Sequence, residues 1–409
     1  TVQYDPDTVS NITGVPKEDI IKLARLYGTV SPSFIRIGNG FQHHDNGGMN
    51  TRAVACLPAL TGQWLKKGGG AIKSNSGYLA FNRRKLQRPD LLKNKRTRII
   101  NMNEIGEALL SLEPPIKAMF VYNSNPAVVA PAGEKVRKGL AREDLFLVVH
   151  DLFLTETAKF ADIVLPATSS YENLDFYTSY WHHYIQLQQP VINPYGESKS
   201  NTEVFRLLSK AMGFREEALQ ETDEQLIKSA IDDSSNHNLE GITLESLKRN
   251  KFQKAKIKPI LSERLSTSSG KIELYSKRME RLGYEPLPAY NPIEDDGVHP
   301  FTFIPTVNHN FLNSTFSNNE KHKSLEKKPR IHLNERDAAK LGIKEGDLVR
   351  VWNDRGEVHL TASVGNNVLP KVAVTQGLWG DDEGTRQLVN SLTPDRLSDM
   401  GGGAVFFSC

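Results

Sequence analysis

The stretch AMFVYNSNPAVV, residues 118 to 129, decides the fold. Residues 119–122 are a short apolar run with β-branched and aromatic members, which is typical of a buried strand. Pro126 stops the strand because proline donates no hydrogen bond to a sheet. The polar turn 123–125 therefore follows directly on a strand end. In an open α/β sheet, ligands bind at the carboxyl ends of the strands, so this turn predicts a ligand contact.

Strand and helix patterns alternate on both sides of that turn. The predicted strands are 116–122, 145–149 (LFLVV) and 162–167 (DIVLPA), and the predicted helices are 132–141 and 155–160. This alternation favours a parallel sheet of the Rossmann-like kind. Three strand ends would then meet at one edge: the turn 123–125, His150-Asp151 and the residues 166–168.

The first 70 residues predict part of another α/β domain. We expect a helix within 16–28, a strand at 34–38 (FIRIG) and a helix at 51–62. The following segment, 66–82 (KKGGGAIKSNSGYLAFN), is rich in glycine and short polar residues. We expect it to form no regular element but to bring backbone N–H groups close to a ligand.

The rest of the chain predicts two further units and a linker. Residues 71–285 form an α/β nucleotide-binding domain with a helical insert, with helices in 201–214 and 242–250 and a strand at 270–276 (GKIELYS). Residues 286–298, rich in proline and acids, form the linker. Residues 299–409 contain short β segments and one helix, 335–342, which favour a compact β-barrel. The fold class is therefore α/β: Rossmann-like parallel-sheet layers followed by a C-terminal β-barrel.

The composition narrows the class of protein. The 409 residues are 38% hydrophobic and 24% charged, with a net charge of +3, which is typical of a globular protein and argues against a nucleic-acid partner. No apolar run approaches the roughly 18 residues of a membrane helix, so we expect no direct membrane span. Two cysteines, Cys56 and Cys409, are too few for a disulfide framework or a thiolate cluster. The first residue, Thr1, leads us to expect a piece of a longer protein.

Two histidine pairs and one pair of acidic residues could also form a metal or acid/base site, but their patterns are weak signals for one. His43-His44 and His182-His183 are adjacent pairs, and adjacent side chains rarely converge on one metal ion, so we predict no metal ligands among them. We expect the first pair on a surface or ligand-facing loop and the second on a strand. Glu156 with Asp162 is a conceivable acid/base pair, but a carboxylate at a helix start is favoured by the helix dipole in any protein.

Several segments, taken in order, resemble the molybdopterin-dependent oxidoreductases of the dimethyl sulfoxide reductase and formate dehydrogenase superfamily. They are LTGQWLKKGGG (60–70), VYNSNP (121–126), HDLFLTETAKFADIVLPATSSYE (150–172), SGKIELYS (269–276) and GLWGDDEGTRQLVNSLTPDRLSDMGGGAVFF (377–407). The resemblance runs through nearly all of the chain. It implies that the C-terminal barrel, 299–409, is a double-psi β-barrel that binds a molybdopterin dinucleotide.

The resemblance also implies a cofactor, bis(molybdopterin guanine dinucleotide) with molybdenum or tungsten, and assigns residues to it. The residues that would hold one nucleotide arm are Asn123, Ser124, Asn125, Asp151, Thr155 and Thr157. A carboxylate such as that of Asp151 suits the two donors on the edge of guanine. Helix N-terminal N–H groups favour a pyrophosphate near the two threonines.

Other segments would face the metal and the pterins. The loop after the three glycines carries Lys73, Ser74, Asn75 and Gly77, and Lys73 is the candidate closest to the metal, because a cation could stabilise electron-rich dithiolenes. The segment NHNFLNSTFSN (308–318) points to His309, Asn313 and Ser314, and NSLTPD (390–395) points to Asn390, Thr393 and Asp395. For NSLTPD a plain turn and helix cap is the alternative.

The chain departs from the family pattern in four places, one of which is Tyr195 in PYGESKSN (194–201), where the family often has a second proline. The Cys-rich iron–sulfur segment and the residue that ligates the metal are missing, so an iron–sulfur cluster would belong to sequence outside this chain. The family's Asn-containing turn after ADIVLPA is replaced by DFYTSYWHH (175–183).

The predicted function is two-electron redox or oxygen-atom transfer at the metal, with a small-molecule redox substrate and an electron-transfer partner protein. We expect the cytoplasm, with the periplasm or export left open. The alternatives are a molybdopterin-type scaffold or electron-transfer subunit without metal, and a plain dinucleotide-dependent dehydrogenase, which the missing G-x-G-x-x-G disfavours.

Overall fold

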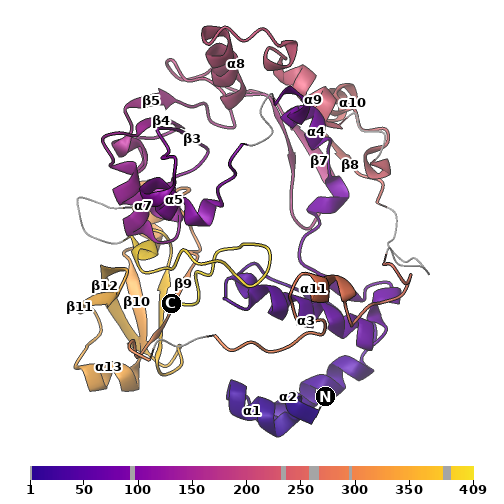
Figure 1. The fold of residues 1–409 in the computed structure, drawn as a ribbon, viewed down its shortest axis with the longest axis vertical. Helices are drawn as coiled ribbons and strands as arrows, with labels where there is room; N and C mark the ends of the chain where they lie inside the picture. Colours follow the sequence, from indigo (N-terminus) through magenta and orange to yellow (C-terminus); the bar gives the residue numbers. More distant parts are fainter. Residues whose placement is uncertain (1, 93–96, 232–235, 258–266, 294–296, 381–387) are drawn as a thin grey trace.

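The computed structural model describes residues 2–92, 97–231, 236–257, 267–293, 297–380 and 388–409. Figure 1 shows the elements arranged around a ring, with the N-terminal helices opposite the β3–β5 layer and the C-terminal sheet beside that layer. The fold is mixed α/β, with parallel sheets and one curled, mixed sheet. None of the described helices is long and apolar enough to cross a membrane.

The predicted parallel sheet is confirmed. Strands β3 (Ala118–Tyr122), β4 (Phe146–Asp151) and β5 (Ile163–Pro166) pair in parallel in that order. Helices α5 (Ile105–Ser111) and α7 (Gly133–Leu140) pack on one face through an aliphatic core that includes Leu109 and Leu147. Helix α8 (Asn201–Ala211) contacts the sheet through Phe205, whose ring centroid lies 5.3 Å from that of Phe120. The expected helix at 155–160 is only a short 3-10 turn, Ala158–Phe160.

A second, two-stranded parallel pair lies near the N-terminus. Strand β1 (Phe34–Arg36) pairs with β2 (Gly70–Ile72). The expectation of no regular element in 66–82 is therefore wrong at β2, because Gly70 adopts a φ of 103° that brings its N–H to the Ser33 carbonyl and starts the pairing. Helix α3 (Gly47–Leu60) follows β1 and begins four residues earlier than predicted.

An antiparallel sheet, of which the sequence predicted only one strand, supports the helical insert. It consists of β6 (Asp175–Thr178), β7 (Tyr184–Gln188) and β8 (Phe252–Lys254), in that order. Helices α9 (Asp223–Ile231) and α10 (Leu244–Asn250) share its apolar core.

Two expectations fail in this part of the chain. The pair His182-His183 lies in the turn between β6 and β7, not in a strand, because the second strand of the hairpin begins only at Tyr184. The segment 270–276 is a loop: the Glu273 carboxylate accepts hydrogen bonds from Ser268 and Ser269, and no described strand pairs with it. Its alternating pattern thus reflects local turn contacts.

The C-terminal sheet is mixed and five-stranded, with the order β11-β12-β10-β13-β9. Its strands are β9 (Thr302–Thr306), β10 (Arg330–Asn334), β11 (Leu348–Asn353), β12 (Gly356–Gly365) and β13 (Val372–Gln376). Helices α12 (Glu320–Glu326) and α13 (Glu335–Leu341) connect them, and Ile331 and Leu360 anchor the core.

The remaining helices are α1 (Pro6–Thr13), α2 (Lys17–Thr29), α4 (Arg83–Gln87), α6 (Pro126–Val129) and α11 (Lys277–Arg281). The expected linker, 286–298, forms no helix or strand in its described residues, and 294–296 lie outside them. It is held against α3, since Arg52 donates to the carbonyls of Glu285 and Pro286.

Candidate functional site

The predicted strand ends do meet at one edge of the β3–β5 sheet. Tyr122 is paired with His150, and Asp151 with Pro166, so the residues that follow these strands emerge side by side. Asn123 and Ser124 are exposed there, and Asn123 holds a left-handed φ of 52°. Their side chains are free to meet a ligand at the edge where parallel sheets bind them.

Asn125 and Thr157 have a different place. Both are buried, and the Asn125 Oδ1 accepts hydrogen bonds from the Thr157 N–H (3.1 Å) and hydroxyl (2.7 Å). The Asn125 amide donates to Glu156 at 2.9 Å, and the Ala127 N–H donates to the Thr157 hydroxyl. This pair therefore joins the loops after β3 and β4 and holds the exposed turn in position.

Asp151 is the most distinctive group at this edge. Its side chain is partly buried, and burial raises the pKa of its carboxyl although the backbone N–H of Leu152 donates to it at 2.7 Å. Among the described residues, no lysine or arginine forms an ion pair with it. A partly desolvated carboxylate without a cation is costly unless donors approach it, so Asp151 is a candidate to accept hydrogen bonds from a ligand.

Three other polar side chains near Asp151 form hydrogen bonds within the protein. The Thr155 hydroxyl accepts from the Ala158 N–H at 3.3 Å. Asp162 accepts from the Leu147 N–H at 2.6 Å, while Glu156 receives the Asn125 amide. The two acids are thus structural acceptors rather than an acid/base pair.

The loop after β2 meets the loop after β1. The Lys73 ammonium donates to Asn39 Oδ1 at 3.1 Å, and Ser74 and Ser76 share a hydrogen bond of 2.9 Å. Asn75 is only 3% exposed, and its amide donates to the His182 carbonyl at 2.9 Å, so it fixes the β6–β7 turn. Gly77 is exposed in the same loop.

His43 and His44 lie close to this loop, which the sequence did not reveal. Their rings contact Phe406 and Phe407 at centroid distances of 5.4–5.6 Å. Burial, together with the Lys73 charge, lowers the pKa of His43, and burial lowers that of His44. The signal available in the sequence was the Gly38-Asn39-Gly40 break at a strand end.

The candidates on the C-terminal sheet fall into two groups. His309 and Asn313 are exposed, and Asn313 has a φ of 50°, whereas the Ser314 carbonyl accepts from the Ser317 hydroxyl. Asn310 ties this loop to α12 through two hydrogen bonds to Glu326, of 2.6 and 2.9 Å.

Asn390, Thr393 and Asp395 join the C-terminal sheet to the β3–β5 layer. Asn390 is 3% exposed and its amide donates to the Val128 carbonyl at 2.8 Å, while the Thr393 hydroxyl donates back to the Asn390 carbonyl. Asp395 forms an ion pair with Lys135 at 2.8 Å. These contacts fit a structural turn between the two layers.

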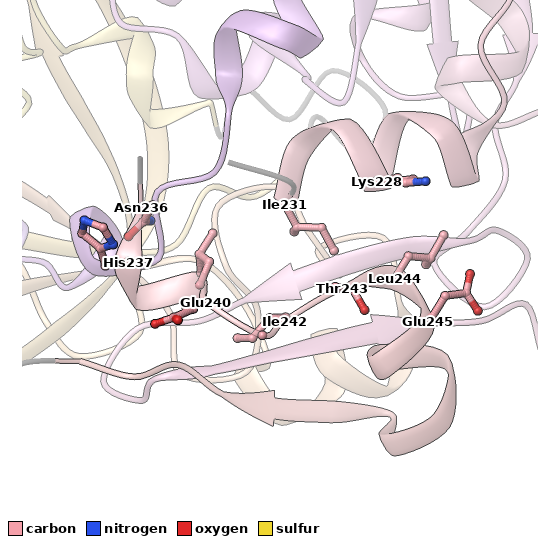
Figure 2. A pocket seen from close by; sticks show the side chains of 11 residues that line it. Lys228, Ile231, Asn236, His237, Glu240, Ile242, Thr243, Leu244 and Glu245 are labelled. Carbon is pink, nitrogen blue, oxygen red and sulfur yellow. The ribbon is translucent and has the colours of Figure 1, made fainter. Parts of the chain in front are cut away.

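A cavity in the helical insert lies away from these residues. Figure 2 shows the side chains that line it, between α9 and the segment that leads into α10. Its volume is about 460 Å³. Its lining includes Ile231, Leu239 and Ile242, which belong to the apolar core of the insert. None of the residues assigned to the cofactor lines it, and it borders a segment outside the described residues, so it does not define the site.

Two family models match this chain. A family model described as molybdopterin oxidoreductase matches residues 17–211, and a second, described as a molybdopterin dinucleotide-binding domain, matches residues 301–409. The two models therefore include both strand-end loops and the whole C-terminal sheet.

Relatives match along almost the entire chain. The "Probable oxidoreductase YoaE" of Bacillus subtilis is 64% identical over 407 residues, which are 99% of this chain and 60% of that protein. "Dimethyl sulfoxide reductase DmsA" of Escherichia coli is 29% identical over 454 residues, 98% of this chain and 56% of that protein. The chain thus spans a little over half the length of these curated relatives.

A solved structure, "Acetylene Hydratase from Pelobacter acetylenicus", superposes with a TM-score of 0.78 at 22% identity. The superposition covers 99% of this chain and 63% of that one. This likeness supports the overall fold.

Proposed function

Because the chain belongs to the molybdopterin oxidoreductases, in the family of the dimethyl sulfoxide reductases, we propose that it is the cofactor-binding part of an enzyme that uses bis(molybdopterin guanine dinucleotide). The cofactor, with molybdenum or tungsten, supplies two-electron redox or oxygen-atom transfer, and the residues of this chain bind and orient it. An iron–sulfur cluster, if present, is held by residues other than the two cysteines of this chain.

The Asp151 carboxylate carries the proposal. Guanine presents two adjacent N–H donors. A carboxylate whose pKa burial raises, and which pairs with no lysine or arginine in the described part of the chain, gains most from receiving them. The exposed Asn123 and Ser124 stand beside it at the same sheet edge and would bind the sugar or phosphates of that arm. Asn125 and Thr157, buried in the protein, would position this turn.

Lys73 is the proposed contact nearest the metal centre. It lies at the carboxyl end of β2, hydrogen-bonded to Asn39, where it can turn its positive charge toward electron-rich sulfurs. In the C-terminal sheet, which we propose to be a double-psi barrel, the exposed His309 and Asn313 would contact a pterin. The mixed parallel and antiparallel pairing of its strands is compatible with that topology.

The remaining parts of the proposal concern partners and location. The substrate is a small redox-active molecule, as the name of the dimethyl sulfoxide reductase relative indicates for that protein. A separate protein would exchange electrons with the enzyme, and we place the enzyme in the cytoplasm.

The proposal is tested by the cofactor content of the protein purified from a cell that makes the cofactor. We expect about one molybdenum or tungsten and two GMP per protein, the latter released by acid. The variant Asp151→Ala should lose part of the GMP, whereas Asp354→Ala, which removes an exposed carboxylate from the β11–β12 turn, should not.

Absence of both metal and GMP from the wild-type protein would instead favour the scaffold or electron-transfer subunit without metal. Retention of all GMP in Asp151→Ala would contradict the guanine contact.

A further inference from the structure

We propose that the turn between β6 and β7, residues 179–183, selects the substrate of the enzyme, and that it selects small molecules that carry both an aromatic ring and a negatively charged group. The turn belongs to the segment 175–183, where the chain departs from the family pattern. The inference rests on the proposed function, because that function places Lys73 beside the metal centre. No residue of the turn is among those assigned to the cofactor above.

The turn lies against the loops that follow β1 and β2. Asn75, two positions after Lys73, is buried, and its amide donates to the His182 carbonyl at 2.9 Å. Arg36, the last residue of β1, places its guanidinium carbon 4.3 Å from the centroid of the Trp181 ring. The segments at the carboxyl ends of both strands therefore contact the turn, at the edge of a parallel sheet where ligands bind.

The backbone of the turn is held in an unusual conformation. Trp181 has a φ of 72°, in the left-handed region that residues other than glycine rarely adopt. Asn75 holds both ends of the turn, since its amide also donates to the Ser179 carbonyl at 3.4 Å. Tyr78 adds a ring contact to His183, with 5.7 Å between the centroids. A strained residue that its neighbours hold in place is typical of functional sites.

The turn nevertheless leaves two aromatic rings open to solvent. Tyr180 is 54% exposed and Trp181 is 45% exposed, and their ring centroids lie 6.0 Å apart at an interplanar angle of 31°. A large aromatic side chain that is fixed in place contacts a ligand at a low cost in conformational entropy, and aromatic rings pair favourably with other rings. The two side chains therefore form a surface on which the ring of a substrate can pack.

Arg36 adds a positive charge to that surface. It is exposed, and within the described ranges no carboxylate forms an ion pair with it. A guanidinium that lies over an aromatic face can still bind a carboxylate through its N–H groups. The Lys73 ammonium, by contrast, already donates to Asn39. Arg36 is therefore the group that binds the charged part of the substrate, while the substrate ring packs on Trp181 or Tyr180.

The inference is tested by the binding of three acids to the whole enzyme, purified from a cell that makes the cofactor. The probes are benzoate, cyclohexanecarboxylate and acetate, which share a carboxylate but differ in the ring, and calorimetry measures their dissociation constants. The test variants are Trp181→Leu and Arg36→Gln. The C-terminal sheet supplies the matched controls Trp352→Leu and Arg350→Gln, because Arg350 also lies over an exposed tryptophan ring, 5.3 Å from the Trp352 centroid.

We expect the wild type to bind benzoate more tightly than cyclohexanecarboxylate, and acetate most weakly. Trp181→Leu should weaken benzoate binding by roughly 3- to 10-fold, the usual effect of one aromatic pair, and leave cyclohexanecarboxylate binding nearly unchanged. Trp181→Phe keeps a ring at the same backbone angle and should bind benzoate almost as well as the wild type. Arg36→Gln should weaken both ring acids by roughly 10-fold, because it removes a charged donor, and both controls should bind as the wild type does.

A spectroscopic measurement separates a substrate site from a remote surface site. Because the turn adjoins the loop of Lys73, saturating benzoate should change the electron paramagnetic resonance signal of the metal in the wild type. An unchanged signal would place the acid away from the substrate and overturn the inference.

Equal binding of benzoate by Trp181→Leu and Trp352→Leu would also overturn it, as would unchanged binding by Arg36→Gln. So would a wild type that binds none of the acids, the result expected if another part of the protein covers the turn. Metal and GMP contents are measured on the same preparations. If both are normal and the aromatic preference is missing, this inference alone fails, whereas their absence from the wild type contradicts the proposed function.

Discussion

The Asp399 carboxylate accepts a hydrogen bond from the Gly48 N–H at 2.8 Å, across 351 positions of sequence. It also accepts from the Met49 N–H at 3.0 Å, so it caps the N-terminus of α3, where the local residue Asn46 provides no side-chain cap. Arg396 adds a two-point contact to Asp45 nearby. The last residues of the chain therefore complete a helix near its start.

Removal of this long-range cap should loosen α3. We expect Asp399→Ala to cost about 0.5–2 kcal/mol, because a helix cap and the favourable interaction of a carboxylate with the helix dipole are both lost. Amide hydrogen exchange at Gly48 and Met49 measures the effect locally. The exposed Asp354→Ala serves as the control, and unchanged exchange at both amides in Asp399→Ala would refute the capping role.

At the β3–β5 edge, we expect a buried polar residue to affect stability and an exposed polar residue to affect cofactor content. Thr157→Val keeps the shape but leaves the Ala127 N–H and the Asn125 Oδ1 without their hydroxyl partner, which should lower the free energy of unfolding by about 1–3 kcal/mol. Ser124→Ala, at an exposed position without a left-handed backbone, should leave stability within about 0.5 kcal/mol but reduce the GMP content. Urea unfolding measures the stability of both variants, and acid release measures their GMP content. If Thr157→Val lost GMP at unchanged stability and the exposed variant lost stability at unchanged GMP, Thr157 would be the ligand contact and the exposed residue the structural one.

The parallel layer could be predicted because its signals are local. Each of its strands is an apolar run that ends at a polar turn or a proline, and the helices between them repeat at the helical period. Strand β8 has no such signal: it is three residues long, and its partner β7 lies more than 60 positions earlier. The segment 270–276 shows the reverse error, since alternation without a partner strand makes only a loop.

The sequence predicted which polar residues lie near the candidate site, but not whether their side chains point into the protein or outward. The sequence shows that Asn125, Thr157 and Asn390 are polar, but it cannot show that their side chains turn inward. Asn125 bonds to the Thr157 N–H, Thr157 to the Ala127 N–H, and Asn390 to the Val128 carbonyl. Asp151 and Asn123 remain open to a ligand. Likewise, no sequence pattern reveals that the Asn308 amide lies against Gly377, which is distant in the sequence.

The neutral histidines beside Lys73 should make stability depend on pH. Burial and the Lys73 charge lower the pKa of folded His43 below its usual value of 6.5, and burial lowers that of His44, so the unfolded chain binds protons first as the pH falls. The free energy of unfolding should therefore decrease as the pH drops through about 6.5 and level off below the folded pKa values.

Urea unfolding between about pH 7.5 and 5.5 measures this slope. His43→Phe retains an aromatic ring against Phe406 and Phe407 but cannot take up a proton, so it should flatten part of the dependence. A slope as steep in His43→Phe as in the wild type would assign the effect to other groups, among them His332, whose pKa burial also lowers.

Gly377 should tolerate alanine less well than Gly346 does, although both are left-handed glycines of the C-terminal sheet region. Their φ angles are 81° and 88°, so the backbone strain of alanine is similar at both. At Gly346 the new methyl meets nothing within 4 Å, whereas at Gly377 it would overlap the Asn308 amide. We expect Gly346→Ala to cost about 1 kcal/mol and Gly377→Ala about 1–3 kcal/mol more.

Because the overlap involves one side chain, adding Asn308→Ala to Gly377→Ala should recover part of that excess, while adding it to Gly346→Ala should recover nothing. Equal losses for the two single variants in urea unfolding would mean that the Asn308 amide is not held against this turn.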